Sequence, residues 1–105
     1  MTERTQLSQQ DEALRQTRLD THIREGLLFI ADKLTQIKPG HLMTEDQRLA
    51  VALTSAHTVR KDHPGQDIDE LETHLLRRMP FTTGTTVTRD EYATQLRLKV
   101  QGVTL

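Results

Sequence analysis

The sequence of 105 residues contains no cysteine. This absence excludes disulfide bridges, thiol catalysis, and zinc or iron–sulfur sites built from cysteine. Only three residues are aromatic, Phe29, Phe81 and Tyr92, which is too few for the stacking platform that single-stranded nucleic-acid binders use. We therefore expect neither a disulfide scaffold nor a single-strand binder.

Long apolar runs are also missing. The longest, residues 27–31, is far shorter than the roughly 20 residues that a membrane-spanning helix needs. Because there is also no apolar segment near Met1, the sequence predicts a cytoplasmic protein with no membrane partner.

The net charge is −1 and the charges are evenly spread, so no basic segment is available for a phosphate backbone. Nucleic acid is a disfavoured partner.

Helix breakers and helix caps give the chain its pattern. Breaks containing proline and glycine fall at residues 39–40, 64–65 and 80–84. Each is followed within a few residues by a capping-box pattern, at 44–47, 67–70 and 88–91. A breaker followed by a cap is a start signal for a helix, so we expect a new helix after each break.

These signals predict an all-α fold, a compact bundle of four to five helices in a single domain over 8–105, with residues 1–7 disordered. The helices are expected at 8–38, 45–60 and 68–79, and Gly26 is expected to mark a kink or a break in the long first one. The last quarter of the chain fits two patterns. Residues 92–100 alternate as in a β-hairpin with 85–88, but the capping box and a four-residue apolar spacing favour a helix.

Two apolar faces are expected on these helices. In the first helix the apolar residues alternate at spacings of four and three, which places on one face Ile23, Leu27, Ile30, Leu34 and Ile37. This face is long enough to meet both the chain's own bundle and a partner, and we predict it as the interaction face. The second helix is expected to turn inward Leu49, Ala52, Leu53, Ala56 and Val59.

No catalytic, metal-binding or nucleotide-binding motif accompanies this pattern, so the sequence predicts no enzyme activity, no cofactor and no metal site. By elimination, it predicts a small non-enzymatic protein–protein interaction module: an adaptor, a chaperone or an inhibitor that docks on a larger complex. A homodimer is a second form of partner. The alternative functions are a DNA-associated transcriptional regulator with a helix-turn-helix-like core over 45–79, and a metal- or ligand-binding protein using His57, His63 or His74.

Overall fold

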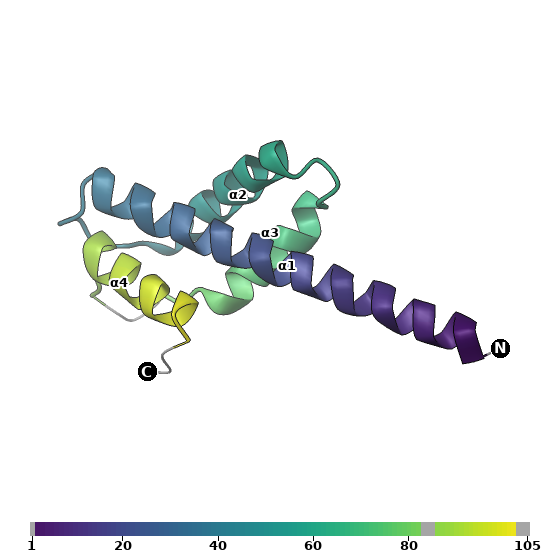
Figure 1. Ribbon diagram of the computed structural model, residues 1–105. Coiled ribbons are helices and arrows are strands. Elements are labelled where there is room, and N and C mark those ends of the chain that lie inside the picture. Colours follow the sequence, from purple (N-terminus) through teal and green to yellow (C-terminus); the bar gives the residue numbers. More distant parts are fainter. Residues whose placement is uncertain (1, 83–85, 103–105) are drawn as a thin grey trace.

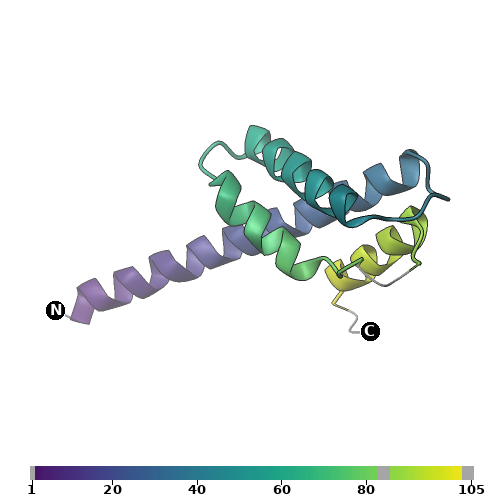
Figure 2. The same ribbon diagram turned by 180° about the vertical axis from the view of Figure 1, so that it is seen from behind.

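The structure, a computed structural model, describes residues 2–82 and 86–102, and for residues 2–9 it describes the backbone only. Four helices make up this part of the chain: α1 (Thr2–Gln36), α2 (Glu45–Asp62), α3 (Ile68–Arg78) and α4 (Arg89–Val100). Figure 1 shows α1 running the length of the molecule with α4 beside its C-terminal half. The reverse view in Figure 2 shows α2 and α3 on the other side of α1. The predicted compact all-α fold is confirmed, with four helices in the described residues rather than five.

The predicted caps lie directly before helices. Thr44 Oγ1 and Asp67 Oδ1 each accept a hydrogen bond from the backbone N–H three residues on, at 3.2 and 2.9 Å. Thr88 and Glu91 form the complete reciprocal box. The Glu91 N–H donates to Thr88 Oγ1 at 3.2 Å, and the Glu91 carboxylate accepts from the Thr88 N–H at 3.1 Å. The three predicted helix starts are therefore confirmed.

The C-terminal quarter forms the helix α4, so the hairpin alternative is wrong. Within the described residues the only β-type contact is an isolated antiparallel bridge between Leu42 and Thr88. Two backbone bonds of 2.8 Å flank this bridge, from the Met43 N–H to the Val87 carbonyl and from the Arg89 N–H to the His41 carbonyl. The capping box favours a helix because its side chains bond the N–H groups that the first helical turn leaves free. In a helix the apolar residues spaced four apart also fall on one face, which a hairpin would not achieve.

Helix α1 runs through Gly26 without a break and begins at Thr2, upstream of the expected start at residue 8. Gly26 lies against α2 and α3: a Cβ added to it would stand 2.8 Å from Leu75 Cδ2 and 3.1 Å from Ser55 Oγ. The Ser55 hydroxyl donates to the Gly26 carbonyl at 2.7 Å. The glycine therefore allows the helices to approach closely, and the expected break is wrong. The predicted disorder of residues 1–7 stays a prediction.

The core is a single cluster of side chains from all four helices, together with Met43 before α2 and Met79 after α3. On α2 it contains Ala52, Ala56 and Val59 as predicted, but Leu49 and Leu53 are exposed. Arg48 and Ser55 are buried instead. The rotation of α2 follows from polar contacts, since Ser55 bonds to α1 and Arg48 bonds to the end of α3. That rotation turns two leucines out to solvent.

Candidate interaction surfaces

The predicted interaction face on α1 is mostly covered by the chain itself. Ile23, Leu27, Ile30 and Leu34 are buried in the core, and only Ile37, beyond the last turn of α1, is 51% exposed. A partner could reach the four buried side chains only if the bundle opened. The surfaces that remain accessible lie elsewhere.

The N-terminal half of α1 projects away from the other helices as an arm, defined here as residues 2–18 (Figures 1 and 2). Every side chain from residue 10 to residue 18 is exposed, and Leu19 is the first buried one. Leu14 is 55% exposed on this arm. Among the described side chains of the arm, Arg15 pairs with Glu70 on α3 at 3.2 Å. In its described side chains, residues 10–18, the arm therefore buries no residue of its own.

A wide groove lies where the arm leaves the bundle. It has a volume of about 1100 Å³ and is bounded by α1 on one side and by residues 62–67 and Glu70 on the other. Its lining carries both signs of charge: Asp11, Arg15 and Arg18 on α1, and Asp62, Asp67 and Glu70 on the opposite wall. The groove is open to solvent and its lining mixes charged side chains with apolar ones such as Leu14, as expected of a docking surface for a peptide or helix rather than a closed site for chemistry.

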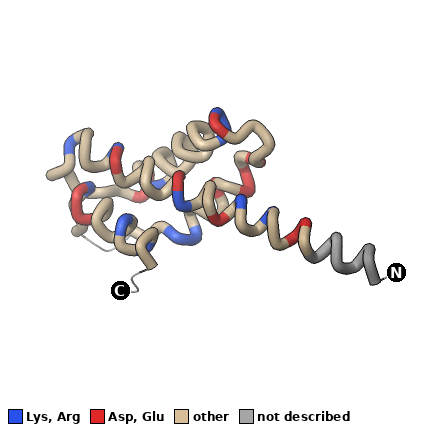
Figure 3. Tube along the Cα trace, in the orientation of Figure 1, with Lys and Arg blue, Asp and Glu red and all other residues tan. Residues whose placement is uncertain are grey.

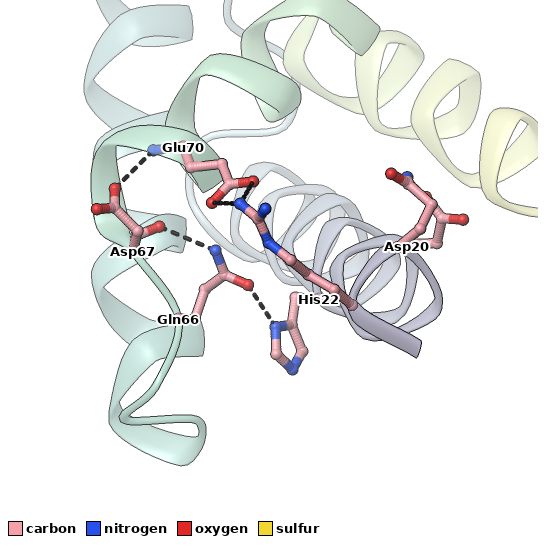
Figure 4. Close-up of polar contacts among 7 residues, drawn as sticks. Asp20, His22, Gln66, Asp67 and Glu70 are labelled. Atoms are coloured by element: carbon pink, nitrogen blue, oxygen red, sulfur yellow. Dashed lines mark hydrogen bonds and ion pairs between the residues drawn. The ribbon is translucent and has the colours of Figure 1, made fainter. Parts of the chain in front are cut away.

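Two histidines fasten the α2–α3 loop to α1 at the base of this groove. The rings of His22 and His63 stack with centroids 4.0 Å apart and planes at 28°. His63 Nε2 lies 2.9 Å from a Glu25 carboxylate oxygen. Figure 4 shows His22 Nδ1 facing Gln66, at 2.7 Å from Oε1, while the Gln66 amide donates to the Asp67 carbonyl. Because the amide nitrogen is used in that way, His22 donates through Nδ1. The contacts of the two histidines therefore hold the α2–α3 loop against α1.

Arg48 joins α2 to the end of α3. Its side chain is buried, and its guanidinium donates to the Leu76 carbonyl at 2.6 Å, to the Met79 carbonyl at 3.2 Å, and to Glu45 at 2.7 Å. The carbonyls are those that a helix end leaves unpaired, so Arg48 caps α3 from another helix. Sequence reasoning missed this role, although the spacing of 48, 52, 55 and 59 marks a helical face.

Phe81 stacks on the outer side of this arginine. The guanidinium carbon lies 4.7 Å from the ring centroid, and Phe81 is 74% exposed. Beside it, the Thr82 hydroxyl donates to Glu45 at 2.9 Å, and this bond, followed by Arg48, lowers the pKa of Glu45. Leu49 and Leu53 follow Glu45 at one-turn intervals on the same face of α2. Leu49 and Leu53 are therefore two exposed apolar side chains on one face of α2.

Acidic residues at the N-termini of α2 and α3 disfavour the alternative that these helices form a DNA-binding helix-turn-helix. Helices α2 and α3 are joined by residues 63–67, and the first turns carry Glu45 and Asp46 on α2 and Asp69 and Glu70 on α3. Either helix, entering a groove by its N-terminus, would set carboxylates against phosphates. The DNA-binding alternative stays a prediction that no contact in the structure favours.

Among the described residues, no three His, Cys, Asp or Glu side chains lie where they could share a metal ion, and His57 stands exposed on α2. No described helix is both long enough and apolar enough to cross a bilayer. Comparison of the chain with protein-family models, with curated proteins and with solved structures gave no match.

Proposed function

We propose that this protein is a non-enzymatic protein–protein interaction module, an adaptor, chaperone or inhibitor that docks on a larger complex through the arm of α1. The observation that carries the proposal is the exposure of the whole described part of that arm, residues 10–18. The predicted interaction face over residues 23–37 is largely occupied in the core, so the proposal moves docking to the preceding turns of the same helix.

The arm needs packing from outside its own bundle to be a stable helix. Residues 2–18 span about 25 Å at 1.5 Å per residue, and isolated helices of about 15 residues are marginal in water. In proteins most helical stability comes from packing an apolar stripe. Over its described side chains, residues 10–18, the arm has an ion pair to the bundle through Arg15 and an exposed leucine at position 14. Contact with a partner would supply the packing that its own bundle does not.

The groove at the base of the arm supports the same reading. It offers a partner segment a wall on α1 and a second wall on the α2–α3 loop. Its mixed charges favour a partner of defined charge pattern over a purely apolar one, because unpaired charges in a contact are costly. The partner would therefore contact the arm along its length and place a segment in the groove.

The experiment is site-specific photocrosslinking in the host cell. A photoreactive residue is placed at Leu14 on the arm and, as a control, at Thr94, which is exposed on α4. We expect one discrete adduct from position 14 and none from position 94. An adduct with the mass of the chain itself would identify a homodimer. Equal adducts from both positions, or none from position 14, would remove the arm as the docking surface.

A binding measurement with the purified partner completes the test. Leu14→Asp is expected to weaken binding at least tenfold, about 1.4 kcal/mol, because it removes an apolar contact at the centre of the arm. The matched control is Gln10→Asp, which adds the same charge to an exposed position one turn away. If both variants weaken binding equally, the effect is one of charge and the leucine is not an anchor.

A further inference from the structure

A second, smaller hollow lies on another side of the bundle, where the last turns of α3 and α4 meet the middle of α1. Its volume is about 340 Å³. Its apolar lining is Val100, which is half-buried, over the edges of Ile23 and Leu27, which are only 2% and 3% exposed. The charged lining consists of one acid and three cations, contributed by three helices: Asp20, Arg24, Arg78 and Lys99.

The three cations are not neutralised by acids. Within the described residues none of them has a carboxylate oxygen within 4.0 Å, whereas Arg15, Arg48 and Arg97 each do. The acid of the hollow, Asp20, accepts instead from the Gln16 amide at 3.0 Å. The basic bands on α1, α3 and α4 can be followed in Figure 3. The hollow therefore holds an excess of positive charge.

Helix ends account for part of this charge. The Lys99 ammonium donates to the Arg78 carbonyl at 2.7 Å, and the Arg78 guanidinium donates to the His74 carbonyl at 3.3 Å, as cations near helix C-termini do. An ammonium has three donors and a guanidinium five, so each cation keeps free donors after these bonds. Arg24 lies in the middle of α1, where no helix end explains it.

From this combination we infer that the hollow is a binding site for a small aliphatic monocarboxylate. The carboxylate would accept from Arg24, Arg78 and Lys99, and its alkyl chain would lie mainly against Val100, with Ile23 and Leu27 beneath it. The volume lies at the lower end of the range for small-molecule sites, about 300–1,000 Å³. A single negative charge fits better than a phosphate dianion, because Asp20 stands in the same lining and repels added negative charge. The inference is independent of docking by the arm.

The test is an NMR titration of the whole chain with four probes: hexanoate, acetate, inorganic phosphate and hexylammonium. Hexanoate is expected to shift the amides of residues 20–27, 78 and 99–100 and to bind most tightly, because it alone satisfies both the cations and the apolar surface. Arg24→Gln and Lys99→Gln should each weaken hexanoate about two- to fivefold, the range of exposed ion pairs. Arg60→Gln is the control, since Arg60 is exposed at the end of α2, outside the hollow.

Each other outcome overturns the inference in a recognisable way. Hexylammonium binding as tightly as hexanoate would show an apolar hollow in which the cations have no role. Acetate or phosphate binding as tightly as hexanoate would show a simple anion site. Hexanoate affinity unchanged in Arg24→Gln, or lowered equally in Arg60→Gln, would show general attraction to a charged surface.

Discussion

Replacing Gly26 with alanine tests the close contact at the centre of the bundle. In an exposed helix the change would stabilise by about 1 kcal/mol, because alanine has the higher helix propensity. Here the new Cβ would stand 2.8 Å from one methyl of Leu75 and 3.2 Å from the other, and 3.1 Å from Ser55 Oγ. Leu75 and Ser55 are both fully buried, so neither side chain can move out into solvent.

The expected magnitude follows from these opposing effects. Overpacking a filled core costs about 1–3 kcal/mol. Displacing the Ser55 hydroxyl from the Gly26 carbonyl costs about 1 kcal/mol more. Against the propensity gain of about 1 kcal/mol, we expect Gly26→Ala to lower the free energy of unfolding by about 1–3 kcal/mol.

The assay is urea unfolding followed by far-ultraviolet circular dichroism, carried out as a double-mutant cycle with Leu75→Val. Valine lacks both Cδ atoms, so in that background the alanine should cost much less or stabilise, with a coupling of about 1–2 kcal/mol. A Gly26→Ala protein more stable than the wild type would refute the packing argument. A coupling below about 0.5 kcal/mol would show that Leu75 does not oppose the added methyl group.

Three further predictions concern buried and titrating groups. Arg48→Ala should lower the unfolding free energy by about 3 kcal/mol in urea, because it leaves the last carbonyls of α3 without donors, whereas exposed Arg60→Ala should change it by less than about 0.5 kcal/mol. The Thr88 backbone N–H, and then its hydroxyl, lower the pKa of Glu91. The stability that these bonds give is present above about pH 4.5 and is lost as the pH falls further. Acid unfolding of Glu91→Gln should therefore show a smaller pH dependence than acid unfolding of the wild type. Burial raises the pKa of Tyr92 to about 12, so the folded state should lose stability as pH rises from 10 to 12, and Tyr92→Phe, followed by urea midpoints across this range, should remove that loss.

The helices were predictable because their signals are local. Thr44, Asp67 and Thr88 cap the helices that follow them by bonds within one turn, and such bonds depend little on the rest of the fold. The helix at 89–100 was harder to assign, since an alternating pattern and a four-residue pattern overlap there, and the capping box decided between them.

The surfaces were less predictable because they depend on how helices rotate against each other. Leu49 and Leu53 look like core residues in sequence, yet the bonds of Arg48 and Ser55 turn them outward. The face from Ile23 to Leu34 was recognised as apolar, but periodicity does not say whether a chain's own helices or a partner cover it. The stacked His22 and His63 come from α1 and from the α2–α3 loop, which are far apart in sequence, and neither residue has a local signal that predicts contact with the other.

The backbone clasp between the α1–α2 connection and the start of α4 bears on the order of folding. The amides of Met43 and Arg89 bond across two segments that α2 and α3 separate along the chain. Closing so long a loop costs entropy before the contacts form, so α4 should attach after the other three helices have packed. We expect the two amides to exchange their hydrogens at a common rate set by the undocking of α4, faster than the amides beside Gly26 exchange.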